Sequence, residues 1–131
     1  MKTILALVLL LFASTTLAQN LGTLRTSPFD PSSVHNPFGA GSPFNTNGLR
    51  NPYSPYGSPF SNRSWTNPYA TQAPRIYEGN QYLGRLSTSR FEPDSTSNPF
   101  GRYGSPFSPD SINNPFGAGS PFGRPLTLFG D

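Results

Sequence analysis

Few side chains in this sequence are suited to catalysis. The chain has one His, His35, and no Cys, so a Ser–His or Cys–His nucleophile would depend on His35 alone. Sister copies of a repeated segment carry Ser97 and Asn113 at the position of His35, which is typical of a neutral polar site. The six acidic residues lie in turn-rich sequence that offers little burial, whereas acid–base catalysis needs carboxylates with tuned pKa values. The sequence therefore predicts that the protein is not an enzyme.

Two acidic segments superficially resemble calcium loops, namely residues 92–95 (EPDS) and 108–111 (SPDS). A calcium-binding EF-hand loop has oxygen ligands at alternate positions, Gly at the sixth position and a bidentate Glu at the twelfth. Here Pro occupies an interior position, and neither Gly nor Glu stands where the loop requires it. Asp and Ser beside Pro are also typical of helix N-caps. We favour the capping interpretation, which requires neither a metal nor another cofactor.

The charge pattern argues against nucleic acid as a partner. Lys2 is the only Lys, and from residue 19 onwards the chain contains eight Arg and six acidic residues. The Arg residues are dispersed, whereas a nucleic-acid interface concentrates basic residues on one face. Since Arg stacks well on aromatic rings, we expect weak Arg–aromatic contacts instead.

The tripeptide Asn-Pro-Phe begins at Asn36, Asn98 and Asn114, and Asn-Pro-Tyr begins at Asn51 and Asn67. Eukaryotic endocytic adaptors of the EH-domain type recognise Asn-Pro-Phe in a turn, but they are cytosolic and the match is three residues long. Asn bonds its own backbone, Pro fixes φ and a following Gly tolerates positive φ, so the motif is typical of turns.

These motifs belong to a longer repeat, FSPDSINNPFGAGSPF at residues 107–122, with copies at 29–44 and 91–107 and a partial copy at 51–60. Each copy predicts one short helical or 3₁₀ turn, a break at Asn-Pro, and two further turns. The copies form either a flexible low-complexity chain, which we favour, or units docked around a common centre. In both cases they display aromatic side chains, chiefly Phe38, Phe44, Phe100, Phe107, Phe116 and Phe122.

The first 18 residues are typical of a cleaved signal peptide. Lys2 precedes an unbroken apolar run at 4–12, and small residues then predict cleavage before Gln19. The run is too short to cross a bilayer, which takes about 20 residues. We expect a protein exported to the periplasm or the extracellular space, and not an integral membrane protein after cleavage.

The exported chain is poor in core-forming residues. It keeps all 16 Pro and 13 Gly, about a quarter of its residues, which is typical of low-complexity or disordered chains. It has one Val, two Ile and no Cys, so neither an aliphatic core nor disulfides are expected to stabilise it. The predicted fold class is mostly irregular coil with short helical turns.

Residues 75–86 (RIYEGNQYLGRL) are the exception, because strand-forming residues flank a Gly-Asn turn. They predict a β-hairpin in which Tyr77 faces Tyr82 and Ile76 faces Leu83. An isolated hairpin is marginal in water, so we expect a flanking aromatic such as Phe91 to cover one face. Around it we expect a flexible repeat region at 19–74 that begins with an unstructured leader at 19–28, tandem repeats at 87–122, and a tail at 123–131 in which residues 126–129 favour a strand.

The segment from Tyr77 to Phe122 resembles a group of small exported bacterial proteins. That group has a Tyr-X-Gly-Asn-Tyr-X-Gly-Lys-Leu hairpin followed by Asp-Pro-Asp-Ser-X-X-Asn-Pro-Tyr-Gly-X-Tyr-Gly-Ser repeats. This chain differs in using Phe where the group mostly has Tyr, and Arg85 where Lys is usual. The resemblance implies a bacterial, exported protein and supplies no mechanism.

Two functions remain open. The first is a non-enzymatic interaction or envelope-associated structural protein, whose repeated Phe residues and hairpin Tyr77 and Tyr82 bind a protein or envelope partner, or further copies of the chain. Such contacts would be individually weak and collectively strong. The alternative is a small secreted module that folds around the hairpin and binds calcium or a carbohydrate, with candidate contacts at Asp94, Asp110, Tyr77, Tyr82 and Trp65.

Overall fold

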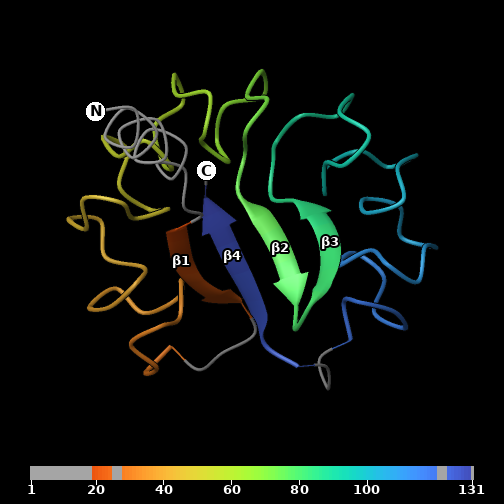
Figure 1. Ribbon diagram of the computed structural model, residues 1–131, viewed down its shortest axis with the longest axis horizontal. Coiled ribbons are helices and arrows are strands. Elements are labelled where there is room, and N and C mark those ends of the chain that lie inside the picture. The colour runs from red at the N-terminus through yellow and green to blue at the C-terminus, as the bar shows by residue number, and fades with distance from the viewer. Residues whose placement is uncertain (1–18, 25–27, 121–123, 131) are drawn as a thin grey trace, which may run out of the picture.

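A computed structural model describes residues 19–24, 28–120 and 124–130 of the chain. The predicted signal peptide at 1–18 and the candidate contact Phe122 lie outside these residues. Four antiparallel strands form one sheet in the order β1-β4-β2-β3 (Figure 1). They are β1 (Gln19–Leu24), β2 (Arg75–Glu78), β3 (Gln81–Arg85) and β4 (Leu126–Gly130).

The expected fold class, mostly coil with short helical turns, is wrong. The described residues contain this four-stranded sheet and no helix. The supposed leader at 19–28 supplies β1, and the supposed tail supplies β4, which lies inside the sheet. Along β4, buried Leu126 and Leu128 alternate with half-buried Thr127 and Phe129, the pattern of a strand with one core-facing side. Its neighbours β1 and β2 are distant in sequence, which is why local patterns did not reveal its place.

The expected hairpin is present as β2 and β3, with Tyr77 opposite Tyr82. The predicted pairing of Glu78 with Gln81 is also confirmed. The predicted pairing of Ile76 with Leu83 is wrong, because a bulge shifts the register and places Arg75 opposite Arg85. Phe91 does not cover the hairpin, since its side chain is 92% exposed. The hairpin is instead extended into a larger sheet by β4, which pairs with Arg75, Ile76 and Tyr77 of β2 and places Leu128 beside Ile76.

The sheet has an approximate internal two-fold arrangement, in which β1 corresponds to β3 and β4 to β2. The sequence Leu-Gly-X-Leu ends β1 and recurs at the end of β3, where its last Leu directly follows the strand, and each outer strand has a register break at the equivalent position. Equivalent partners confirm the correspondence: Asn20–Phe129 with Tyr82–Tyr77, Gln19–Gly130 with Gln81–Glu78, and Thr23–Thr127 with Arg85–Arg75. We call the chain from β1 to β2 (19–78) the first half and the chain from β3 to β4 (81–130) the second half. Because β1 pairs with β4 and β2 with β3, each half pairs only with the other, and the two halves interlock.

The same correspondence extends to the edges of the sheet. The Thr23 amide donates to the Ser32 carbonyl over 2.8 Å, and Arg85 donates equivalently to Asp94 over 2.7 Å. Each contact forms a parallel bridge, Thr23 with Ser33 and Arg85 with Ser95. Both edge strands are therefore paired with the loops that follow them.

Two long connections contain β-turns that recur every three residues rather than helical turns. We call residues 30–70 the first turn array and residues 92–120 the second turn array. In both, the amide of one turn-starting residue donates to the carbonyl of the residue three positions earlier, as from Asn36 to Ser33 and then from Gly39 to Asn36. One extra residue interrupts the period at Gly57 and again at Gly104. In Figure 1 the arrays flank opposite sides of the sheet, the first beside β1 and the second beside β3.

Side chains at the turn-starting positions explain this period. An Asp, Asn or Ser oxygen accepts the amide of the residue two positions later, as from Phe38 to Asn36 Oδ1 and from Phe60 to Ser58 Oγ. In the Asn-Pro-aromatic turns the Asn amide also donates to the carbonyl six residues earlier. Pro then pre-sets φ at the next position. At Asp30, bonds from the Ser32 amide and hydroxyl hold the pKa below its ordinary value.

The interior departs from the usual distribution of residue types, with the aliphatic core confined to the neighbourhood of the sheet. It consists of Leu21, Val34, Leu49, Tyr56, Ile76, Leu83, Leu126 and Leu128. Beyond Val34, Leu49 and Tyr56, which join this core, the arrays bury chiefly small hydroxyl side chains. These are Ser33, Ser54, Ser64, Ser95 and Ser111, each at most 2% exposed. Their aromatic side chains mostly point outwards. Hydrogen-bonded turns thus replace the large apolar core that the composition cannot provide.

Candidate interaction surfaces

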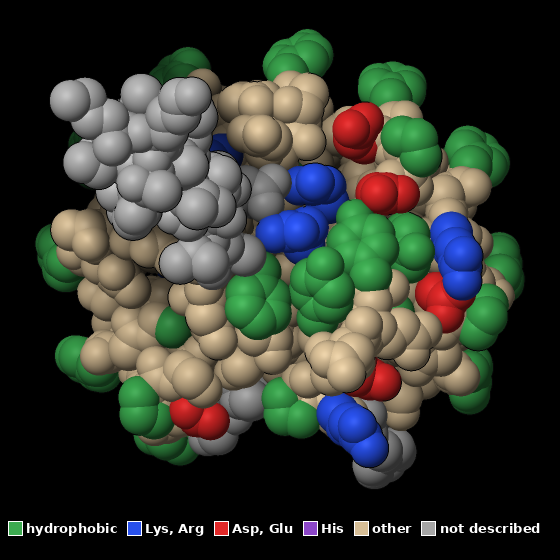
Figure 2. Space-filling model, in the orientation of Figure 1, with side chains coloured by type: hydrophobic (Ala, Val, Ile, Leu, Met, Phe, Trp, Pro, Cys, Tyr) green, Lys and Arg blue, Asp and Glu red, His purple; other side chains and the backbone are tan. Residues whose placement is uncertain are grey.

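The most exposed large side chains are aromatic and lie on the turn arrays and their approaches. Ten of them, which we call the rim aromatics, are 87–97% exposed: Phe29, Phe38, Phe44, Tyr53, Phe60, Tyr69, Phe91, Phe100, Phe107 and Phe116. Hydrophobic side chains stand out around much of the outline of the molecule in Figure 2. Five of the six phenylalanines predicted as contacts belong to this set, and the sixth, Phe122, is outside the described residues.

Each of those five rim aromatics is fixed at its backbone. The Phe38, Phe100 and Phe116 amides donate to the side-chain oxygen of an Asn two residues earlier. The amides of Phe44 and Phe107 donate to a Ser hydroxyl in the same way. The turn therefore sets the direction of each ring's Cα–Cβ bond. This lowers the entropy that a contact through the ring must overcome.

The predicted contacts Tyr77 and Tyr82 lie elsewhere, on the sheet face opposite the aliphatic core. They form part of a line of four rings, which we call the aromatic row: Phe129, Tyr77, Tyr82 and Tyr103. Successive ring centroids lie 5.7, 5.6 and 5.4 Å apart, and the rings are tilted by 78°, 57° and 70°. Figure 2 shows hydrophobic side chains gathered over β4, β2 and β3, beside a pair of basic side chains. All four rings are half-buried, so each leaves part of its surface open to solvent.

Polar side chains border the Tyr82 end of the row. The Tyr82 hydroxyl donates to Asp94 Oδ2 over 3.0 Å. Burial, followed by this bond and the Asp94 charge, raises the pKa of Tyr82 well above its ordinary value. Asp110 accepts from Arg102 Nε over 2.7 Å and from Gln81 Nε2 over 3.3 Å. The proximity of Asp110 raises the pKa of Arg102, so the border carries paired charges.

Arg–aromatic contacts, which the sequence led us to expect, are present among the described residues. The Arg102 guanidinium lies 5.7 Å from the centroid of Tyr103, and Arg63 lies 5.4 Å from that of Tyr56. The first contact extends the aromatic row, and the second covers a ring that is itself buried in the core.

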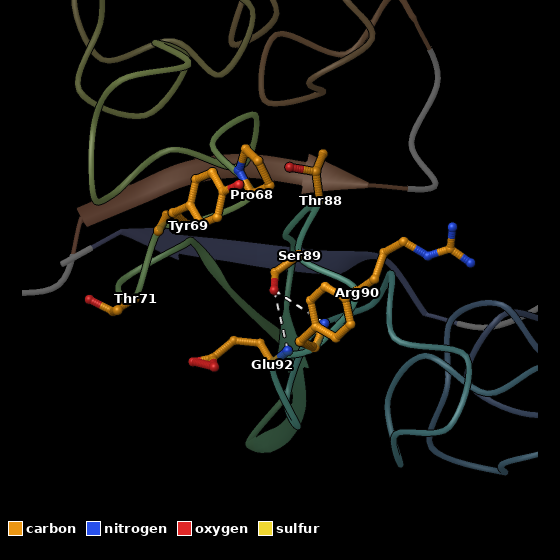
Figure 3. A pocket seen from close by; sticks show the side chains of 9 residues that line it. Pro68, Tyr69, Thr71, Thr88, Ser89, Arg90 and Glu92 are labelled. Carbon is orange, nitrogen blue, oxygen red and sulfur yellow. Dashed lines mark hydrogen bonds between the residues drawn. The ribbon is translucent and has the colours of Figure 1, made fainter.

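A groove of about 410 Å³ lies between the end of the first turn array and the start of the second (Figure 3). Tyr69 and Phe91 line it but are 87% and 92% exposed, so they border the groove rather than fill it. The Ser89 hydroxyl accepts the Glu92 amide over 3.2 Å at its base. Arg90 and Glu92 give the lining both signs of charge.

The candidate Trp65 is not brought to the aromatic row. Its indole donates to the Leu49 carbonyl over 2.7 Å, and its ring packs against the aliphatic core. Together with Leu24 and Leu86 it lines an apolar cavity of about 200 Å³, which His35 also borders. His35 Nδ1 lies 3.4 Å from Arg50 Nη2.

Sequence reasoning missed two members of the aromatic row and half of the rim aromatics. Tyr103 and Phe129 come from segments far from the hairpin, and nothing local indicates that they join it. The rim aromatics missed were Phe29, Tyr53, Phe60, Tyr69 and Phe91. Counting in threes from each turn-starting Asn, Ser or Gly would have found most of them, because an outward aromatic stands two residues after such a position.

The described residues contain no group of three or more His, Cys, Asp or Glu side chains that could hold a metal ion. Within the same ranges, no helix has the length and apolar character needed to cross a membrane. Comparison with protein-family models found no match, and comparisons with curated proteins and with solved structures gave no significant match.

Proposed function

We propose that this chain is an exported, non-enzymatic protein that makes multivalent contacts through its rim aromatics. The supporting observation is the presence of ten large aromatic side chains that are 87–97% exposed on hydrogen-bonded turns. Its partner is a component of the cell envelope or further copies of the chain.

The energetic argument starts from the rings themselves. Burying one Phe-sized side chain is worth about 1.5–3 kcal/mol, and each rim aromatic forgoes most of this in the isolated molecule. Because the rings are separated around the outline, one partner molecule contacts few of them, and overall strength comes from several weak contacts made together.

The charge of the chain supports contacts between copies. From residue 19 onwards it has eight Arg and six acidic residues, so electrostatic repulsion between molecules is weak. Arg side chains can also stack on the exposed rings of a neighbouring copy.

The alternative calcium-binding module gains no support from its two candidate acids. Asp94 accepts the Tyr82 hydroxyl, and Asp110 pairs with Arg102 and Gln81. We do not propose calcium binding.

The test replaces Phe38, Phe44, Phe100, Phe107 and Phe116 together by Ser and compares the variant with the same five positions changed to Tyr. Tyr is a matched control because Tyr53 and Tyr69 already occupy this turn position. Sedimentation velocity over a range of concentrations measures association between copies, and co-sedimentation with isolated bacterial envelopes measures retention.

We expect the Ser variant to lose association or retention by about two orders of magnitude, while the Tyr variant keeps most of it. Single Ser substitutions should each have a small effect. If the wild type shows neither association nor retention, or if the five Ser substitutions change neither, the rim aromatics are not the contact surface.

A further inference from the structure

Comparison of the two halves distinguishes side chains that the fold requires from side chains that it does not require. Positions needed by the scaffold are the same in both halves, as Leu21 and Leu83 show. The repeated set is Leu21, Gly22, Leu24, Ser33, Asn36 and Gly39 in the first half, and Leu83, Gly84, Leu86, Ser95, Asn98 and Gly101 in the second. Where two equivalent backbone sites carry different residue types, the backbone conformation does not determine the residue type.

Tyr77 and Phe129 are equivalent and aromatic in both halves, but the other two rings of the aromatic row and Asp94 of its border occupy positions that differ. Tyr82 corresponds to Asn20, and Asp94 corresponds to Ser32. Tyr103 lies in a turn that is one residue longer than its counterpart, Gly39-Ala40-Gly41. The first half forms the same strand, bulge and edge bridge without these side chains. The scaffold therefore does not require a ring at Tyr82 or Tyr103.

We infer that the aromatic row is a carbohydrate-binding surface for a single chain of a neutral, β-linked polysaccharide. Pyranose rings present flat faces of C–H groups that pack on aromatic rings. The spacing of 5.4–5.7 Å between centroids is comparable to the length of one sugar unit. This inference concerns a different surface from the rim aromatics and does not rest on the proposed function.

The polar border fits a ligand rich in hydroxyl groups. Asp94 and Asp110 are acceptors, and Gln81 and Arg102 are donors, all at the Tyr82–Tyr103 end of the row. Planar groups of this kind exchange hydrogen bonds with sugar hydroxyls. At this end of the row the Arg102–Asp110 ion pair cancels charge and Asp94 adds a carboxylate, which suits a neutral ligand better than an acidic one.

The inclination between neighbouring rings favours a single polysaccharide chain over a crystalline polysaccharide surface. Neighbouring rings are inclined by 57–78°, so the row is an undulating line and not a flat plane. A single flexible glycan chain can follow such a line. The flat surface of a crystalline polysaccharide cannot lie parallel to neighbouring rings that are inclined in this way.

The decisive variant is Tyr82→Asn, because Asn already occupies the equivalent position. Asn20 Oδ1 accepts the Gly22 amide there over 2.9 Å, so Asn at position 82 has an equivalent partner in Gly84. The matched control is Phe44→Ser, which removes an equally large ring from the rim. Isothermal titration of the exported chain with cellohexaose, chitohexaose, xylohexaose and mannohexaose measures binding, and ¹H–¹⁵N NMR dispersion checks the fold of each variant.

We expect the wild type to bind at least one of these hexasaccharides, and Tyr82→Asn to bind about tenfold more weakly or less, as for a typical aromatic hot spot. Phe44→Ser should bind like the wild type. If Tyr82→Asn does not fold, Tyr103→Ala replaces it, since Ala keeps the Cβ that lies against Gly84. The inference is overturned if no hexasaccharide binds, if polygalacturonate or crystalline cellulose binds instead, or if the folded variant binds unchanged. None of these outcomes bears on the rim aromatics, which the envelope and sedimentation assays test separately.

Discussion

At the turn-starting positions, Asn and Ser share a role that Asp cannot fill. Asn98 accepts the Phe100 amide and donates to the Glu92 carbonyl. Ser54 does the same with a hydroxyl, accepting from Tyr56 and donating to the Gly48 carbonyl. Both side chains therefore close the turn ahead of them and join it to the one before. A carboxylate only accepts, so it closes its own turn and leaves the earlier carbonyl unbonded.

Replacing Asn98 by Asp should therefore destabilise the fold. The substitution keeps the acceptor for Phe100 but sets a carboxylate oxygen against the Glu92 carbonyl in place of a donor. We expect the free energy of unfolding to fall by about 1–3 kcal/mol, measured by urea denaturation. Asn98→Ser retains both kinds of bond and should cost less. Equal losses in the two variants would show that the donor to Glu92 has no special importance.

At the scale of elements, sequence patterns identified the structures that depend on residues close together in the chain. The β2–β3 hairpin was predictable because Gly79-Asn80 separates strand-forming residues, and the strand within 126–129 was predictable from its apolar alternation. The strand β1 was missed because Gly22 and the bulge interrupt its pattern. In the turn arrays, the turns at Asn-Pro and Ser-Pro were predicted. The first turn of each repeat was predicted to be helical or 3₁₀, and the chain to be flexible coil, because the 15- or 16-residue repeat hid the period of three.

The bulge in β3 depends on Gly84. Its φ is +92°, and a Cβ there would lie 2.5 Å from Tyr103 Cβ and 2.6 Å from the Asp94 carbonyl oxygen. We expect Gly84→Ala to cost about 3 kcal/mol or more, since it combines backbone strain with a clash against the edge bridge.

Gly79→Ala is the matched control for Gly84→Ala. Gly79 also has positive φ, +62°, but its nearest neighbour would be an Arg124 nitrogen at 3.9 Å. Only the conformational cost of about 1 kcal/mol is then expected. Thermal unfolding of both variants measures the difference, and similar melting temperatures would contradict the role assigned to the clash at Gly84.

At the scale of the molecule, the two halves cannot fold separately into the observed sheet. Each half contributes one outer and one inner strand, and each outer strand pairs with an inner strand of the other half along β1–β4 or within the hairpin β2–β3. The candidate surfaces follow the same division. The predicted rim contacts were local and could be identified from sequence, whereas the aromatic row draws Tyr103 and Phe129 from distant segments.

Interlocking predicts a single unfolding transition. Leu128 lies in the second half and is fully buried beside Ile76, so Leu128→Ala should cost about 2–5 kcal/mol. Trp65 lies in the first half. If the halves unfold together, the urea midpoint measured by Trp65 fluorescence should fall by an amount that corresponds to the full loss in the free energy of unfolding. Phe116→Ser, a substitution at a 97% exposed ring of the second half, should leave the midpoint unchanged. A Trp65 transition unaffected by Leu128→Ala would show that the halves unfold independently.

The bridges at Thr23–Ser33 and Arg85–Ser95 have a consequence for any material this protein forms. Because both outer strands already pair with their own chain there, a neighbouring molecule has no open strand edge to extend at these points. Copies that gather would be joined through side chains and not by a continuous backbone ladder. Such a network would swell, relax and dissolve on dilution like a gel held by reversible cross-links, rather than harden into fibres.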